Sequence, residues 1–237
     1  IIDLLVEEAL KRGNTTPIWH ARTRPAGGAV EAVLRGAAIS KMAEAPLYIV
    51  HMNVAGEVDM VEYARRKGLI LFGETCPQYL FFTEEDLQRP DGAKWVCSPP
   101  LRTPQDQQRL WQGLKEGDIQ VISTDHCPFF FDGTTPIEYE GQKVVIAGKE
   151  LGAEDFTRIP NGLPGVGDRL PILWTTMVSS GEFTLPEFVR LTSTNPARLF
   201  GLYPQKGNLA PGADADIVIW DPKKKVKYGK TYSQQRT

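Results

Sequence analysis

The sequence predicts an α/β fold in which a parallel sheet is built from alternating strands and helices. Three observations carry this prediction. Short β-branched runs recur between segments of helical periodicity, glycine or proline separates them, and several runs end abruptly on acidic or imidazole side chains. Reactive groups at many strand ends favour a barrel over an open sheet, because barrel enzymes collect their sites from those ends.

The composition narrows the class of protein. The 237 residues suffice for one large domain or two small ones, and the formal net charge of −2 gives no support for nucleic acid or an anionic membrane as a partner. No apolar run approaches the roughly 20 residues of a membrane span. Three cysteines without C-x-x-C spacing indicate reduced thiols in a cytoplasmic protein.

Helical periodicity and capping signals place the helices. Thr103 is expected to cap one of them, with Pro104 at its first position and Asp106 three residues after the cap. The first helix has no cap and no preceding Met, which suggests a fragment of a longer protein. The expected helices are residues 1–12, 29–45, 56–67, 103–117 and 165–180, and two more that open at Thr184 and Asn195.

Two of the expected buried strands lead directly into titratable residues. One ends on His51, and another runs into a turn that contains Asp125. Asp125 is a metal ligand or proton-transfer group, or else Asp125 or Ser123 caps the turn after the strand. A His and an Asp at equivalent strand ends favour a shared site. The expected strands are Leu47–Val50, Leu69–Phe72, Trp95–Cys97 and Ile119–Ile122.

The segment Thr16–Arg24 is expected to be a loop. It carries His20 between Trp19 and two arginines, and this positive neighbourhood favours a structural hydrogen bond over a metal role. Phe129–Ala153 is expected to be a long loop over the site. Near the carboxyl end, Lys206–Trp220 predicts a strand, a Pro-Gly turn and a second strand, hence the start of a small β element.

Six motifs in order resemble the carboxyl-terminal half of dihydropyrimidinases and D-hydantoinases, which are cyclic amidohydrolases of the amidohydrolase superfamily. The specific part is the succession of Gly-Glu-Thr-Cys-Pro-Gln-Tyr, Ser-Pro-Pro-Leu-Arg and Ile-Pro-Asn-Gly. Gln78, where many allantoinases have His, favours the hydantoinase side. The motifs are Leu47–His51, Gly73–Tyr79, Ser98–Arg102, Ser123–Cys127, Ile159–Gly162 and Gly207–Trp220.

The resemblance implies a fold and a site. Residues 1–205 would form the carboxyl-terminal half of a (β/α)8 TIM-type barrel, and residues 206–237 would begin the returning part of a small β-sandwich. The family holds two metal ions, usually zinc, bridged by a carboxylated lysine. His51 and Asp125 match metal ligands, and the remaining ligands would lie upstream of Ile1.

The resemblance also implies a reaction. The family opens 5,6-dihydropyrimidines or 5-substituted hydantoins to N-carbamoyl amino acids by a metal-bound hydroxide. Asp125 would act as ligand and proton shuttle, which suits a carboxylate beside an activated water. Ser98 and Asn161 match positions whose main-chain groups hold the cyclic amide. A homotetramer is expected at full length.

The ligand count limits what this chain does alone. Zinc typically takes about four ligands, and two ions need more than His51 and Asp125. We therefore expect the isolated 237-residue chain to bind metal poorly and to be inactive. Two alternatives stay open: a non-catalytic dihydropyrimidinase-like assembly protein, and an allantoinase.

Overall fold

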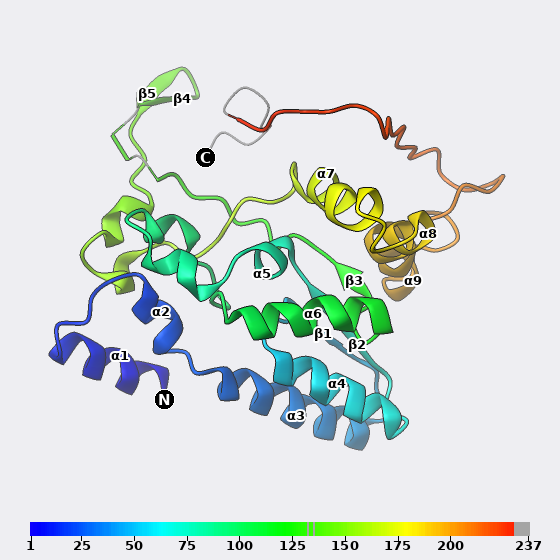
Figure 1. Ribbon diagram of the computed structural model, residues 1–237, viewed down its shortest axis with the longest axis horizontal. Helices are drawn as coiled ribbons and strands as arrows, with labels where there is room; N and C mark the ends of the chain where they lie inside the picture. Colours follow the sequence, from blue (N-terminus) through cyan, green and yellow to red (C-terminus); the bar gives the residue numbers. More distant parts are fainter. Residues whose placement is uncertain (132, 135, 230–237) are drawn as a thin grey trace.

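The computed structural model describes residues 1–131, 133–134 and 136–229 (Figure 1). Its α-helices are α1 Ile2–Lys11, α2 Ile18–Arg22, α3 Ala26–Ala43, α4 Ala55–Arg66, α5 Pro77–Phe81, α6 Pro104–Glu116, α7 Arg169–Leu173, α8 Leu185–Val189 and α9 Asn195–Leu199. Its strands are β1 Leu47–Ile49, β2 Leu71–Thr75, β3 Val121–Ile122, β4 Ile137–Tyr139 and β5 Gln142–Val144.

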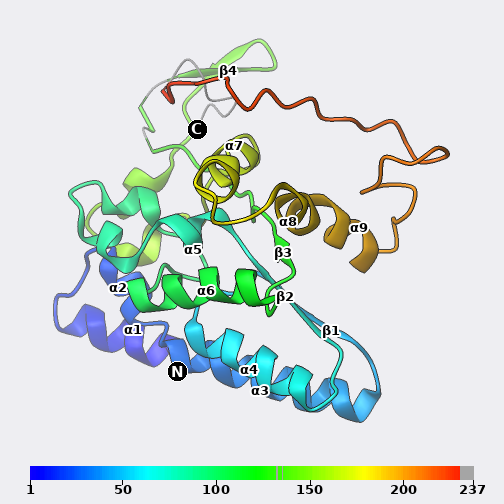
Figure 2. The same ribbon diagram turned by 45° about the vertical axis from the view of Figure 1, so that its right-hand side comes forward.

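A parallel three-stranded sheet in the order β1-β2-β3 lies at the centre. Its register pairs Ile49 with Gly73 and Thr75 with Ile122. Helices α3, α4 and α6 lie side by side along one face of this sheet (Figures 1 and 2). The arrangement is the one expected when parallel strands are joined by helical crossovers.

The core lies between this helical layer and the sheet. Leu71 of β2, Val58 of α4 and Leu110 of α6 are almost completely buried there. Gly113 allows α6 to approach α4, because a Cβ at this position would lie only 2.8 Å from a methyl carbon of Val58. Side chains along β2 alternate between buried and half-buried positions, so one face of the sheet meets the helices and the other is less covered.

The capping predictions are confirmed. The Thr103 hydroxyl accepts a hydrogen bond from the Asp106 amide at 3.2 Å, and Pro104 opens α6. Thr184 caps α8 in the same way. Gly117 ends α6 with a φ of +83°, a conformation that favours glycine.

Two predictions about the chain near His20 and Ser98 were wrong. Thr16–Arg24 contains the short helix α2 instead of only a loop, because Ile18 and Ala21 are buried and packing stabilises the turn. Trp95–Cys97 is not a strand. Gly92–Trp95 forms a 3-10 helix. The carbonyls of Val96 and Cys97 that follow it are bonded by the side chains of Lys149 and His20, and not by another strand.

Two more segments differ from the prediction. The expected loop Phe129–Ala153 carries the antiparallel hairpin β4–β5 and a 3-10 helix at Lys149–Gly152; residues 132 and 135 lie outside the described part. The helix expected over residues 165–180 begins only at Arg169, after a turn over residues 166–168, and it continues as a π-helix over Trp174–Ser179.

The two strands expected within Lys206–Trp220 are not formed. No residue of this segment pairs with another strand in the described part of the chain, and a strand has no ladder hydrogen bonds without a partner. The segment runs out along the molecule as irregular chain (Figure 1), with Lys206 bonded to Asp214 and Asp216. Residues 230–237 lie outside the described part, and the domain division at 205/206 stays a prediction.

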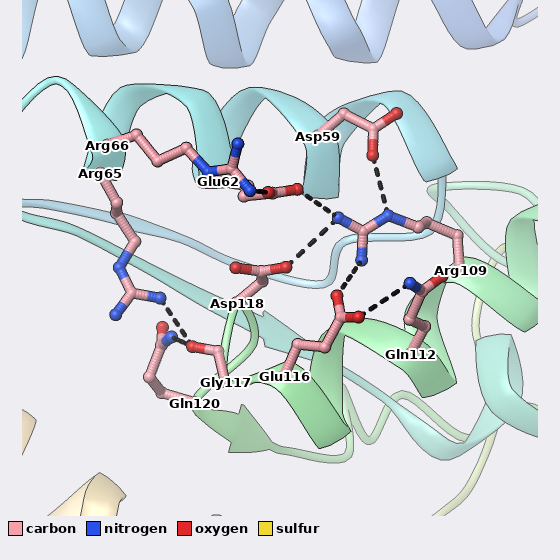
Figure 3. Close-up of polar contacts among 10 residues, drawn as sticks. All are labelled: Asp59, Glu62, Arg65, Arg66, Arg109, Gln112, Glu116, Gly117, Asp118 and Gln120. Atoms are coloured by element: carbon pink, nitrogen blue, oxygen red, sulfur yellow. Dashed lines mark hydrogen bonds and ion pairs between the residues drawn. The ribbon is translucent and has the colours of Figure 1, made fainter.

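A charged cluster is centred on Arg109, between α4 and α6 and before β3 (Figure 3). Its guanidinium donates to Asp59 at 2.8 Å, to Glu62 at 2.9 Å and to Asp118 at 3.2 Å, and it lies 3.7 Å from a Glu116 oxygen. Burial lowers the pKa of Arg109, but these carboxylates outweigh burial and the net shift is upward. The cluster ties two helices to the amino-terminal end of β3.

None of the helices in the described residues is both long enough and apolar enough to cross a membrane.

Candidate functional site

The chain leaves β1 and β3 at the same edge of the sheet. Beyond β1, the Met52 amide donates to the Glu74 carbonyl at 2.8 Å; beyond β3, the Ser123 amide donates to the Thr75 carbonyl at 2.9 Å. Both exits therefore stay beside the carboxyl end of β2. The sheet topology brings the segments that carry the predicted residues to one edge, as sites in parallel α/β folds require.

His51 and Asp125 share an unusual backbone conformation. Their φ angles are +42° and +47°, in the left-handed region that residues other than glycine seldom adopt. Strain of this kind concentrates at functional sites, where the surrounding structure holds it in place. His51 is half-buried and Asp125 is exposed. Among the residues that the structure describes, neither side chain has a hydrogen-bond partner, so both are free for a ligand.

Ser98 and Asn161 lie on neighbouring loops joined through the Val96 carbonyl. The Gly162 amide, directly after Asn161, donates to this carbonyl at 3.1 Å. The loop then passes Asp125, because the Cys127 amide donates to the Leu163 carbonyl at 3.0 Å. Ser98 and Asn161 are both exposed. The main chain thus links three of the predicted positions through residues one or two places away.

Asn53 connects the His51 segment to the Ser98 segment. The side chain of Asn53 is buried, and its Nδ2 donates to the Pro100 carbonyl at 2.6 Å. The Glu57 carboxylate accepts hydrogen bonds from the main-chain amides of Asn53 and Val54, at 2.8 and 2.9 Å. Burial raises the pKa of Glu57, while these two amides lower it. The segments that carry the four predicted residues are therefore joined by hydrogen bonds between their neighbours.

His20 has the structural role that the sequence predicts. It is buried, and its Nε2 lies 2.9 Å from the Cys97 carbonyl and 3.3 Å from the Ser98 hydroxyl. Burial and the nearby Arg24 lower the pKa of His20 from 6.5 to about 4. The ring is therefore neutral near pH 7 and supports the residue before Ser98.

Three further residues shape this edge and were not singled out from the sequence as parts of the site. Asn53 ties two loops together, His126 Nδ1 accepts from the Gly165 amide at 3.0 Å, and Lys149 donates to the Val96 carbonyl at 2.7 Å. His126 follows Asp125 directly and is the one that the motif could have indicated. Lys149 lies in a loop without periodicity, so no pattern pointed to it.

The donors at this edge suit a divalent metal ion but do not complete its coordination. Imidazole and carboxylate are both ligands of zinc, and His51 and Asp125 offer them without competing hydrogen bonds. In the described residues, no group of three or more His, Cys, Asp and Glu side chains is placed to hold a metal. His51 and Asp125 therefore fit a metal as two of its ligands. Cys76, Cys97 and Cys127 are all free thiols.

Comparison with known proteins agrees with this geometry. A model of the amidohydrolase family matches residues 6–235. The chain is 48% identical to a D-hydantoinase of Streptomyces coelicolor over 93% of its own length and 44% of that protein, and 46% identical to one of Geobacillus stearothermophilus over 94% and 45%. The crystal structure of a dihydropyrimidinase from Brevibacillus agri superposes with a TM-score of 0.82 at 46% identity, over 91% of this chain and 44% of that one.

These similarities confirm the predicted resemblance and fold class. The chain spans about half the length of the curated relatives it matches, and its three parallel strands with their helices correspond to part of a TIM-type barrel.

Proposed function

Because this chain belongs to the amidohydrolase family, we propose that it is part of a metal-dependent hydrolase that opens cyclic amides. The substrates would be 5,6-dihydropyrimidines or 5-substituted hydantoins, and the products N-carbamoyl amino acids. The observation that carries this proposal is the pair His51 and Asp125. They follow β1 and β3, the two strands that flank β2 in the parallel sheet, in strained conformations and without hydrogen-bond partners among the described residues. The similarity to D-hydantoinases supports the substrate class.

His51 and Asp125 would hold metal, with the other ligands supplied by chain outside these 237 residues. We propose two zinc ions bridged by a carboxylated lysine. When bound, such ions polarise the amide carbonyl and lower the pKa of water to about 7. The free ring nitrogens and carboxylate oxygens at this sheet edge leave both side chains available for coordination.

Asp125 would also move the proton. An exposed carboxylate without a hydrogen-bond partner in the described structure can take a proton from the attacking water and deliver it to the leaving nitrogen. Its partners in substrate recognition would be main-chain groups at Ser98 and Asn161. These loops meet at the Val96 carbonyl, which sets the spacing for reading a –CO–NH–CO– unit. The ring substituent would point away from this clamp.

The location and assembly of the whole protein follow from the same resemblance. We propose a cytoplasmic homotetramer. The three free cysteines are compatible with a reducing compartment.

The test is metal content and hydrolysis in the protein extended to the full length of its relatives. We expect about two metal ions per subunit, hydrolysis of dihydrouracil or hydantoin, and loss of at least ~10³-fold in kcat for Asp125→Ala, since this residue would serve both metal and proton transfer. The isolated chain should show neither bound metal nor turnover.

Two results would contradict the proposal. A metal-free and inactive full-length protein would favour a non-catalytic assembly role, with His51 and Asp125 retained without function. Hydrolysis of allantoin in preference to dihydrouracil and hydantoin would assign the alternative substrate, against the indication from Gln78.

A further inference from the structure

Lys149 is a buried lysine whose charge is not balanced by a carboxylate. Its exposed fraction is 2%, and it forms no ion pair among the residues that the structure describes. Burying an ammonium group without a counter-ion costs several kcal/mol, and lysines are almost never fully buried unless paired. An apolar side chain would fill the same space at a lower cost in free energy. The hydrogen bonds of Lys149 are therefore the reason for a lysine at this position.

The side-chain hydrogen bonds of Lys149 both reach one short segment. Its Nζ donates to the Lys94 carbonyl at 2.9 Å and to the Val96 carbonyl at 2.7 Å. The Val96 carbonyl also accepts the Gly162 amide at 3.1 Å. The Val96 carbonyl oxygen thus links the loop that carries Ser98 to the loop that carries Asn161. It accepts one hydrogen bond from the Gly162 amide and a second from the Lys149 ammonium.

The backbone of Lys149 is fixed as well. Its amide donates to the Phe130 carbonyl at 2.7 Å. A Cβ on the preceding Gly148 would lie 1.9 Å from that same oxygen, so this close approach requires glycine. The ammonium is therefore presented from an anchored part of the loop that follows Asp125, and not from the exposed hairpin β4–β5.

We infer that Lys149 is a positioning residue for substrate binding, which holds the Ser98 and Asn161 loops at the spacing of the cyclic amide. This inference rests on the proposed function, in which those loops bind the ring. The lysine itself does not touch the substrate. Its ammonium fixes the Val96 carbonyl from one side while His20 fixes the next carbonyl, that of Cys97, at 2.9 Å from the other.

The surroundings keep this ammonium protonated near neutral pH. Burial lowers the pKa of Lys149 from 10.5 to about 8, and the nearby thiols of Cys97 and Cys127 act in the opposite direction. The third titratable group that faces it, His20, is neutral at this pH. Both hydrogen bonds are thus charge-assisted under ordinary conditions, which makes them stronger than neutral ones.

The experiment compares Lys149→Met with Lys143→Met in the full-length protein. Methionine keeps the length and apolar stem of lysine but donates no hydrogen bond. Lys143 lies in the same loop on β5 and is exposed, so it is a matched control. We expect Lys149→Met to raise KM for dihydrouracil about tenfold and to leave kcat within about twofold, because a clamp that holds the ring in ground and transition state acts as uniform binding.

Amide hydrogen exchange gives a second readout that needs no turnover. In Lys149→Met, exchange should accelerate in peptides that contain residues 96–102 and 159–165, and stay unchanged in β1 and β2; Lys143→Met should alter neither. A folded Lys149→Met protein with wild-type KM and wild-type exchange would overturn the inference. Should that variant unfold, Lys149→Gln replaces it, because the glutamine side chain keeps an uncharged NH2 donor group. KM should then rise by a smaller factor, and an unchanged KM would again overturn the inference.

The proposed function and the positioning role of Lys149 can be refuted separately. A wild-type protein without turnover refutes the proposed function and with it the positioning role, even where the exchange data uphold the hydrogen-bonded tie. A wild-type protein with turnover and a Lys149→Met variant with unaltered KM leaves the proposed function intact and refutes the positioning role alone.

Discussion

Arg109 and Asp125 lie toward opposite ends of the same strand, β3, and their surroundings differ sharply. Arg109 is surrounded by four carboxylates, from α4, from α6 and from Asp118 in the segment that leads into β3 (Figure 3). Asp125, just beyond the other end of β3, is exposed, strained in φ and without a hydrogen-bond partner among the described residues.

The difference separates stability from function. Charges that are paired within the fold have their partners already and do not need a ligand. A strained carboxylate without a partner in the fold is available to bind one. In barrels, the carboxyl-terminal ends of the strands carry the chemistry and the amino-terminal ends serve stability. The site that we propose at Asp125 and the charged cluster at Arg109 follow that division.

The largest expected effect is the loss of activity at Asp125. Asp125→Asn should abolish turnover in the full-length protein as Asp125→Ala does, yet change the free energy of unfolding by less than about 0.5 kcal/mol, because no folded-state contact is removed. Urea unfolding alongside kinetics checks both. A strongly destabilised Asp125→Asn protein would show that this carboxylate is structural after all.

Arg109→Met should have the opposite profile. Removing the guanidinium leaves four carboxylates close together without a cation. Glu62 and Asp118 are largely covered while Asp59 and Glu116 are about half exposed, so the cost should be roughly 3 kcal/mol, the low end for a broken buried pair. The loss in the free energy of unfolding should be largest near pH 7 and smaller near pH 4, where the carboxylates begin to protonate. Urea unfolding at both pH values measures it.

Arg35→Met is the control for this change. Among the described residues Arg35 pairs only with Glu31, on the exposed face of α3, so this variant should retain wild-type stability. Equal stabilities for the two arginine variants would remove the contrast between the ends of β3.

Lys149 predicts a pH dependence of stability. Its pKa is about 8 in the folded protein and 10.5 in the unfolded chain, so between these values the unfolded state binds more protons and stability rises with pH. Relative to Lys149→Met, the wild type should gain up to about 3 kcal/mol between pH 8 and 10.5, at 1.36 kcal/mol per pKa unit. Urea midpoints across that range report the gain, and parallel curves for the two proteins would contradict the shift.

The smallest effect is expected for an ion pair on the surface. Lys115 and Glu182 are bonded but both are about half exposed. Glu182→Gln should therefore change the free energy of unfolding by less than about 0.5 kcal/mol. A larger loss, measured at low salt and abolished at 0.5 M salt, would mean that exposed charges contribute more here than the comparison assumes.

Much of the fold could be predicted from the chain itself. The positions of α3, α4 and α6, the caps at Thr103 and Thr184, and the strands leading to His51 and Asp125 all follow from local periodicity and from residues within four positions of each other. Capping and helical periodicity depend on residues that are close in sequence, so they can be predicted without knowledge of distant contacts.

The errors arose where distant contacts decide the local structure. Val96 belongs to an apolar run typical of a strand, but its carbonyl is bonded by Lys149 and by Gly162, 53 and 66 residues further along the chain. Ile217–Ile219 has the composition of a strand, but no segment pairs with it in the described structure. Strand formation depends on a partner, which local propensity does not supply.

The sequence by itself determined the chemistry at the sheet edge: a histidine and an aspartate after buried strands, and motifs similar to those of cyclic amidohydrolases. Only the tertiary structure decided how the Ser98 and Asn161 loops are held to that edge and to each other. Two adjacent carbonyls, those of Val96 and Cys97, are held there by a buried lysine and a neutral histidine from separate segments, and no periodicity predicts these contacts because each spans more than 50 residues.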